Sequence, residues 1–149
     1  MRSTDPLDRF DLQRFIQAQN PVFERVQDEL SDGRKRSHWM WFIFPQFTGL
    51  GDSEMSRHFA IHSAAEAQAY LQHPVLSTRL RTCTQLVLDI EPRPIAAIFG
   101  HPDELKFHSS MTLFAQIDSE DNLFNRALDQ YFHGIPDAWT LTLLDSKQA

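Results

Sequence analysis

Two stretches of this chain combine residue types that suit anion binding and proton transfer. The first, residues 35–46, starts with two cations, a hydroxyl and an imidazole and then becomes densely aromatic. A guanidinium at Arg36 could hold an anionic group through two parallel hydrogen bonds. The imidazole of His38 could transfer protons near neutral pH, which makes His38 a candidate catalytic residue. The candidate ligand-binding residues of this stretch are Lys35, Arg36, Ser37, Trp39, Trp41 and Gln46.

The second stretch, residues 99–114, places a lysine beside two serines. On a helix Asp103, Lys106 and Ser110 share one face, with Ser109 next to them. A lysine beside hydroxyls can activate a nucleophile or bind an oxyanion, so we take Asp103 and Lys106 as candidate catalytic residues and the serines as ligand-binding. The order Lys-x-x-Ser is the reverse of the motif in penicillin-recognising enzymes, and that chemistry is therefore not indicated.

Each stretch also has an ordinary structural interpretation. Large aromatic residues such as Trp39 and Trp41 could stack on a planar ring, but such residues more often form a core. Arg36 and His38 could equally belong to a solvated loop or a helix cap. The second stretch could hold a surface Asp–Lys pair and serines that bond back to their own helix.

A metal site is not expected. His58 and His62 have the i,i+4 spacing of two zinc ligands, but Phe59 stands where zinc peptidases have a glutamate, and no third ligand is indicated nearby. Cys83 lies on an apolar helical stripe and is expected to be buried. We therefore predict no metal and no cofactor.

Length and composition indicate one soluble globular domain that spans residues 1–149. Hydrophobic residues make up 42% and charged residues 23% of the chain, which is typical of globular proteins. The single cysteine excludes an intramolecular disulfide framework. Residues 39–44 form the longest apolar run, far short of the ~20 residues that a membrane span needs. With no signal peptide visible either, a cytoplasmic protein without membrane contact is expected.

The charge distribution favours a small ligand over a polymer. The chain has 14 basic and 20 acidic residues, a net charge of −6, which argues against a nucleic-acid partner. Residues 101–149 hold eight acidic and three basic residues, a net of −5, whereas residues 34–36 form one compact basic cluster. A local basic cluster on an acidic protein suits a small anionic ligand.

Helix signals dominate, and they predict an all-α domain of about seven or eight short helices. Residues 74–90 carry the strongest helical period, with apolar residues spaced 4, 3, 4 and 3. Expected helix starts are marked by Asn20-Pro21, Ser53, Ser63, Asp121 and Asp137. Residues 39–44 could be a helix or a buried strand, because a short apolar run does not reveal its period.

Residues 33–46 and 99–114 together resemble the signatures of a bacterial family known as domain of unknown function 1810. Residues 63–76 and 12–15 resemble it too, and the resemblance covers about residues 10 to 145, with Phe59 and Phe107 in place of an expected Tyr and Leu. The resemblance implies an all-helical single domain and supplies no reaction. Some relatives carry a calpastatin label, but nothing here is similar to a disordered, repetitive protease inhibitor.

A fainter similarity links residues 15–19 and 73–80 to N-glycosidases that act on ADP-ribose-type and riboflavin-pathway substrates. Gln13 stands where that family has an acidic residue, and Phe99-Gly100 replaces its Trp-Gly segment, so catalysis is not carried over. The similarity implies only the class of ligand, a nucleotide or a ribosyl phosphate.

Two hypotheses follow. In the first, the domain binds or acts on an anionic nucleotide or ribosyl phosphate at a site that joins the two polar stretches. In the second, it is a non-catalytic interaction domain whose acidic C-terminal third meets a basic partner.

Overall fold

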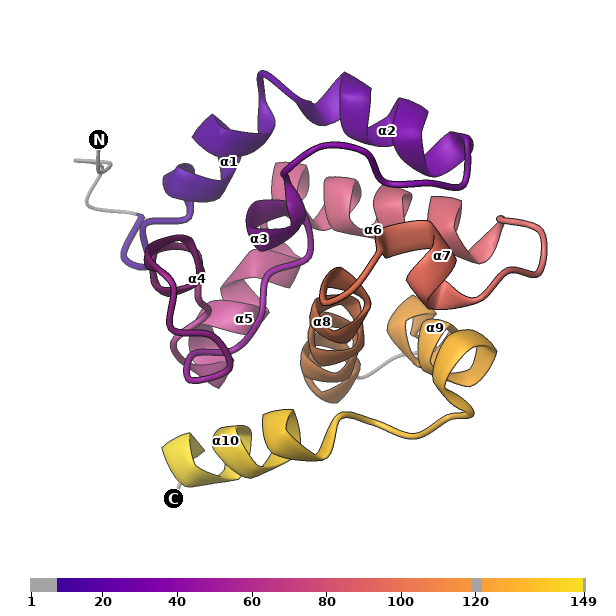
Figure 1. Cartoon of the computed structure of the whole chain (residues 1–149). Helices are drawn as coiled ribbons and strands as arrows, with labels where there is room; N and C mark the ends of the chain where they lie inside the picture. The colour runs from indigo at the N-terminus through magenta and orange to yellow at the C-terminus, as the bar shows by residue number, and fades with distance from the viewer. Residues whose placement is uncertain (1–7, 119–121, 149) are drawn as a thin grey trace.

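A computed structural model describes residues 8–118 and 122–148, and in these ranges the chain folds into ten helices (Figure 1). Within the same ranges the sole β-type pairing is an isolated parallel bridge between Phe47 and Ile61. The all-α prediction is confirmed. The helices are α1 (Gln13–Gln19), α2 (Phe23–Ser31), α3 (Met40–Ile43), α4 (Glu54–His58), α5 (Ala64–Gln72), α6 (Pro74–Leu88), α7 (Ile95–Phe99), α8 (Asp103–Ile117), α9 (Leu123–Phe132) and α10 (Ala138–Gln148).

Two 15-residue helices, α6 and α8, organise the packing. Helix α6 contacts α2, α5 and α9, and α8 contacts α5, α7, α9 and α10, so most of the other helices surround this pair (Figure 1). Helices α1 and α2 lie along one edge and α10 along the opposite edge. In the described part of the chain, no helix is both long enough and apolar enough to cross a bilayer.

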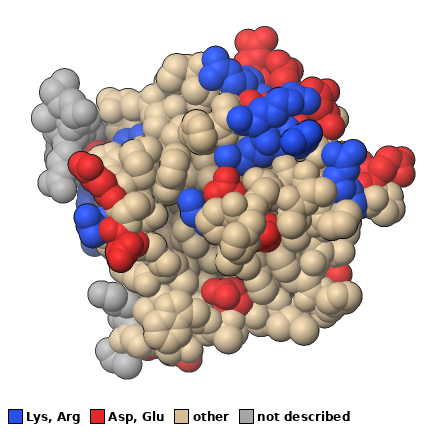
Figure 2. Space-filling view, in the orientation of Figure 1, with Lys and Arg blue, Asp and Glu red and all other residues tan. Residues whose placement is uncertain are grey.

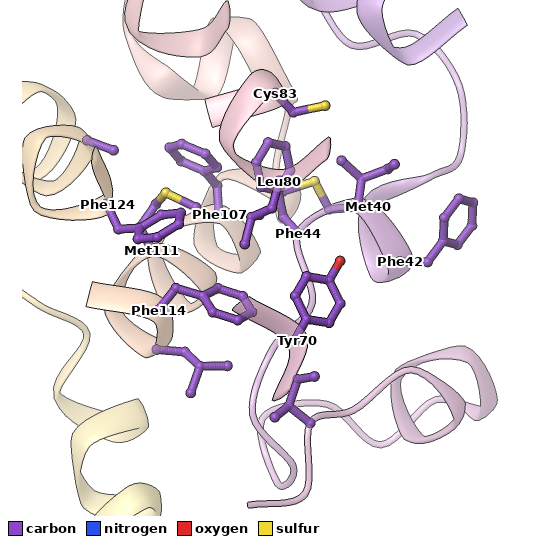
Figure 3. Close-up of a cluster of buried hydrophobic side chains, with 14 of the residues drawn as sticks. Met40, Phe42, Phe44, Tyr70, Leu80, Cys83, Phe107, Met111, Phe114 and Phe124 are labelled. Carbon is purple, nitrogen blue, oxygen red and sulfur yellow. The ribbon is translucent and has the colours of Figure 1, made fainter. Parts of the chain in front are cut away.

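The apolar periodicity of α6 points into the core as predicted. Leu80, Cys83 and Val87 are at most 1% exposed. Burial raises the pKa of the Cys83 thiol to about 12, so this cysteine is an inert core residue. Figure 3 shows Leu80 and Cys83 among aromatic and methionine side chains that come from α3, α5, α8 and α9.

The ambiguous run at residues 39–44 contains a short helix, α3, and no strand. Its side chains point in several directions, and Met40, Phe42 and Ile43 are all buried. A four-residue element with three buried residues is too short and too apolar to show a period, which is why the sequence is compatible with both helix and strand.

The helix starts agree in part with the sequence. Ser53 and Ser63 accept the expected capping hydrogen bonds, and Asp137 accepts one from the Thr140 amide. Asn20 is not an N-cap: its backbone is itself helical, at φ −50° and ψ −50°, and it ends α1 instead.

The other corrections at helix starts concern α2 and α9. Helix α2 begins after Val22, which has no side-chain oxygen to cap it. Asp121 lies outside the described residues, and the side chain that caps α9 is that of Asn122.

A buried arginine joins α1 to the segment between α4 and α5. All five N–H groups of Arg14 are used, and one of them forms a 2.7 Å ion pair with Glu66, whose side chain is 3% exposed. The other four groups donate to backbone carbonyls of Phe10, Asp11, His58 and Ala60. A buried guanidinium with every donor satisfied is a structural tie, because it has no N–H group left for a ligand.

Loss of either partner of this pair should strongly destabilise the fold. Glu66→Gln and Arg14→Met each leave one buried charge without its partner, and we expect a loss of about 3–5 kcal/mol in the free energy of unfolding. Arg36→Met, which breaks an exposed pair with Asp32, should cost less than ~0.5 kcal/mol. Urea denaturation measures all three; equal effects would show that Arg14–Glu66 is no more than a surface pair.

Candidate functional site

One buried carboxylate, that of Glu29, shapes the loop that carries the basic cluster. Glu29 lies in the last turn of α2 and is 4% exposed. Its oxygens accept hydrogen bonds from the backbone amides of Arg36 and Ser37, from the Ser37 hydroxyl and from the Trp39 indole, at 2.6–3.0 Å. The conformation of residues 36–39 is therefore fixed by a side chain of the preceding helix.

The same loop leaves α2 through a glycine. Gly33 has φ +78°, a left-handed conformation that favours glycine, and it is buried. The Arg34 amide donates to the Glu29 carbonyl and the Gly33 amide to the Leu30 carbonyl, which is the Schellman pattern of a helix end. Backbone and side chain of Glu29 thus set the direction of the chain from the end of the helix to Trp39.

Two opposing effects set the pKa of Glu29. Burial by itself would raise it, but the hydrogen bonds from Ser37, Arg36 and Trp39 stabilise the charged form and lower the pKa from its usual 4.5 to about 2. The carboxylate is therefore ionised at neutral pH. Its negative charge is bound by neutral donors, so it cancels none of the nearby cations through an ion pair.

The structure brings the two polar stretches together at two points. Asp103 lies between two lysines: its Oδ2 is 2.8 Å from Nζ of Lys35, and its Oδ1 is 3.3 Å from Nζ of Lys106. Further along, the amide nitrogen of Gln46 donates to the Ser109 hydroxyl at 3.1 Å. The two stretches thus meet at two places along α8, and we call this line of contacts the polar seam.

A basic pocket of about 470 Å³ opens beside this seam. Its cations are Arg34 and Lys35 from the loop after α2 and Arg93 from the segment before α7. The rest of the lining is the α7 segment from Ala96 to Gly100. Figure 2 shows Lys and Arg side chains gathered over this loop, next to α7.

The three cations differ in how far they are neutralised. Lys35 is paired with Asp103 and also lies 5.2 Å from the centre of the Trp39 ring. Arg93 donates to the Gly33 carbonyl at 2.8 Å, and the side chain of Arg34 has no partner within the described residues. No carboxylate appears among the described residues that line the pocket. The two guanidinium groups therefore keep their full charge toward it.

The sequence-predicted cation and imidazole of the loop lie elsewhere. Arg36 forms an exposed pair with Asp32 at 3.1 Å and does not line the basic pocket in the described structure. Ser37 is occupied by Glu29, and the side chain of His38 is exposed. Lys106 lines a pocket to which neither Arg36 nor His38 contributes, and neither of these two residues lines any of the four pockets described here, so the expectation that all three line one concave surface stays a prediction.

The two tryptophans have different surroundings. Trp39 is 1% exposed, donates to Glu29 and carries Lys35 over its ring, so it is a core residue and has no free face for ligand stacking. Trp41 is partly exposed and has the Lys106 ammonium 4.9 Å from its ring centre. Of the two candidates for ring stacking, Trp39 is excluded by its burial.

The two candidate serines of α8 are both buried. Ser109 donates to the Leu105 carbonyl and accepts from Gln46, so its hydroxyl positions the Gln46 amide. The Ser110 hydroxyl is fully buried and has no hydrogen-bond partner among the described residues. Ser110 is therefore out of reach of a ligand in this structure.

A second pocket of about 360 Å³ lies on the other side of Asp103. It is lined by Gln46, Lys106 and Ser109 and by the exposed side chains of Leu105 and Trp139. His108 lines it too, stacked on Phe132 at 4.0 Å with its Nε2 donating to the Ile135 carbonyl. Three residues that the sequence singled out thus meet in one cavity.

His58 and His62 line a third pocket, of about 420 Å³, together with Arg14 and Glu66. Across the described chain, no three His, Cys, Asp or Glu side chains converge as metal ligands would.

Sequence reasoning missed two residues that matter most here. Glu29 stands at an ordinary helical position, and only the three-dimensional return of residues 36–39 shows its role. Arg93 lies between Pro92 and Pro94, two residues that mark the end of a helix and do not by themselves indicate a ligand contact. A cationic residue between two prolines in a short connection indicates a charge on a conformationally restricted backbone, because proline limits its own φ angle and the conformation of the residue before it.

The Glu29 interactions should make stability depend on acidic pH. The folded-state pKa lies below the unfolded one, so the stabilisation is complete above pH ~4.5 and is lost as the pH falls toward 2, in total about 3 kcal/mol. Glu29→Gln should lower the free energy of unfolding at pH 7, and its difference from wild type should shrink across that window. Urea denaturation between pH 7 and 2 measures this. Glu24→Gln, an exposed carboxyl on the same helix, is the control, and a wild-type-minus-Glu29→Gln difference that stays constant with pH would contradict the assignment.

Comparison with known proteins places the chain in a family. Residues 9–144 match the family described as "Protein of unknown function (DUF1810)", close to the span expected from the motifs. The crystal structure of a conserved hypothetical protein, Rv1873, from Mycobacterium tuberculosis is 51% identical and has a TM-score of 0.91, over 93% of this chain and 99% of that one. No curated protein matches the chain significantly, and the similarity to N-glycosidases finds no support in these comparisons. The resemblance of the two signature stretches is thus confirmed, and the chain belongs to the family of the domain of unknown function 1810.

Proposed function

We propose that this domain binds a small phosphate-bearing ligand in the basic pocket of Arg34, Lys35 and Arg93. The single observation that carries the proposal is the convergence of three cations on one pocket, two of them guanidinium groups without a carboxylate partner among the described residues. The sequence suggested a nucleotide or a ribosyl phosphate, and the phosphate group is what these two ligands share.

Guanidinium groups suit phosphate better than other anions of similar size. Their planar fork of N–H groups matches phosphate oxygens in pairs, and such charge-assisted hydrogen bonds are stronger than neutral ones. Arg93 is already oriented by its bond to the Gly33 carbonyl, at 2.8 Å. A ligand therefore meets one arginine that is fixed in place and one, Arg34, that is free to close on it.

The setting favours a small ligand. The chain carries a net charge of −6, so a long polyanion would be repelled beyond the pocket, whereas a single phosphate contacts only the basic lining. Neither nucleic acid nor a membrane surface is therefore the proposed partner. A small phosphorylated ligand also fits the cytoplasmic location that the sequence favours.

Asp103 and Lys106 hold the edge of the basic pocket in position. Asp103 holds the Lys35 ammonium at 2.8 Å, and Lys106 binds the other carboxylate oxygen of Asp103. Because both oxygens contact ammonium groups, Asp103 fixes the position of Lys35 at the edge of the pocket. The proposal is one of binding, and it needs no proton transfer by these residues or by His38.

A thermal-shift experiment with inorganic phosphate, pyrophosphate and ribose 5-phosphate tests the proposal. A ligand present at a hundred times its Kd stabilises the folded state by about 2.7 kcal/mol, which for a domain of this size corresponds to a rise in Tm of roughly 5–10 °C. Arg34→Gln and Arg93→Gln should each weaken binding at least tenfold, and added salt should weaken it in the wild type.

The matched control is Arg36→Gln. It removes a cation from the same loop, but one that is exposed and paired with Asp32. Unchanged affinity in this variant, with loss in the other two, locates the anion in the basic pocket. If all three variants lose affinity equally, binding follows the overall charge of the loop and the pocket assignment is wrong.

A further inference from the structure

The second pocket is lined by residues of α8 and α10 and by the segment that carries Gln46, and the proposed function does not use it. We infer that this pocket binds an uncharged, flat heterocycle of the nucleobase type as a ligand of its own. Among the described residues, the second pocket and the basic pocket have no lining residue in common, and we assign them to separate ligands. The inference therefore does not depend on the proposed function.

The walls of the second pocket suit a flat ring. Trp139, at the start of α10, is 56% exposed, and Leu105, in the first turns of α8, is 53% exposed. Both side chains line the cavity of about 360 Å³, which is within the size range of small-molecule sites. An indole that is more than half exposed at a cavity can stack on a nucleobase, because every base has a π-face.

The polar groups of the pocket favour a heterocycle over a plain aromatic ring. The Ser109 hydroxyl donates to the Leu105 carbonyl at 2.8 Å, so it accepts from the Gln46 amide nitrogen, which fixes the orientation of this amide. Within the described residues, no donor reaches the carbonyl oxygen of Gln46, so this acceptor is open. Lys106 contacts Asp103 at 3.3 Å and has three N–H groups in all, so it has donors to spare. An open acceptor and an open donor in one pocket match a ring that carries both functions on its edge, as nucleobases do.

The charges of the pocket favour a ligand without net charge. Apart from His108, the charged side chains among the described lining residues are Lys106 and Asp137, one of each sign. Both already have partners: Lys106 contacts Asp103, and Asp137 accepts hydrogen bonds from the amide and the hydroxyl of Thr140. The second pocket therefore offers no surplus of charge, in contrast to the arginines of the basic pocket.

Hydrogen bonds between the two walls hold the pocket in shape. The Asp137 amide donates to the Thr112 hydroxyl at 2.8 Å, and Nε2 of His108 lies 2.8 Å from the Ile135 carbonyl oxygen. Thr112 and His108 belong to α8, whereas Ile135 and Asp137 belong to the connection into α10. The backbone that precedes Trp139 is thus tied to α8 before a ligand arrives, which lowers the entropy that binding has to cost.

Isothermal titration calorimetry with adenine, toluene and free phenylalanine tests the inference. Adenine should bind about tenfold or more tightly than toluene, because toluene is a flat ring without groups that can bond to the open acceptor and donor. Adenine should also bind more tightly than phenylalanine, whose ring is attached to two opposite charges.

Three variants locate the ligand. Trp139→Ala should lower the affinity for adenine about tenfold, because it removes the stacking surface, and Trp139→Phe, which keeps a ring, should retain most of the affinity. Gln46→Leu should weaken the binding of adenine and leave that of toluene unchanged. Arg93→Gln, in the basic pocket, should change neither affinity.

The matched control is Ile135→Ala, which removes another exposed apolar side chain, 62% exposed, that is not among the described lining residues. It should leave the affinity for adenine unchanged. Absence of adenine binding, equal affinity for adenine and toluene, tighter binding of phenylalanine, or unchanged adenine affinity in Trp139→Ala would each overturn the inference. None of these results touches the basic pocket, because the thermal shift with phosphate and its arginine variants measure that site separately.

Self-association gives a further test. Sedimentation could show a wild-type dimer that Trp139→Ala converts to a monomer and that adenine does not dissociate. The exposed side chains of the second pocket would then form a contact between copies of the chain, and the heterocycle site would be overturned.

Discussion

The site depends on the burial of one ionised carboxylate that is satisfied by neutral donors. Glu29 is 4% exposed, and burial opposes its charge, yet hydrogen bonds from residues 36, 37 and 39 hold its pKa at about 2. Had a lysine or arginine formed an ion pair with Glu29, that cation would not be available to the basic pocket. Backbone amides, a hydroxyl and an indole stabilise the Glu29 carboxylate instead. The loop is therefore held in a fixed conformation, and its cations form no ion pair with Glu29. The direction in which Arg34 and Lys35 leave the backbone follows from this anchoring and from the left-handed turn at Gly33.

A second carboxylate has the opposite role. Asp103 contacts two ammonium groups, those of Lys35 and Lys106, and so joins the basic loop to the start of α8. Each lysine also lies over a tryptophan ring, Lys35 over Trp39 and Lys106 over Trp41. These contacts restrict both ammonium groups to defined positions. The lysines thus act mainly as rims of two pockets, and the uncompensated charge is left to the arginines.

The fold was largely predictable, because local signals and tertiary packing agree in most of the chain. The apolar stripe of α6 and the caps at Ser53 and Ser63 are local patterns, and the structure has each of them where the sequence places it. The site was predictable only in part. Residue types and the family resemblance selected the two stretches, and Lys35, Gln46, Lys106 and Ser109 do meet along them. What the sequence could not supply is side-chain direction. Arg34 lines the basic pocket, whereas Arg36, two positions further on, pairs with Asp32, and the hydrogen bonds that fix this loop come from Glu29.

Trp39 connects the aromatic core to the loop of the candidate site. Trp39 has rings of Phe44 and Phe99 within 6.5 Å, so its position is set by core packing. Its indole N–H reaches Glu29, and Lys35 lies over its ring. A shift of this one side chain would therefore move the anchor of the loop and the edge of the basic pocket together. Trp39 thus has no free face for a ligand. It connects the rigid aromatic core to the loop that carries the cations, and a pocket built on a loop needs such support to hold its side chains in place.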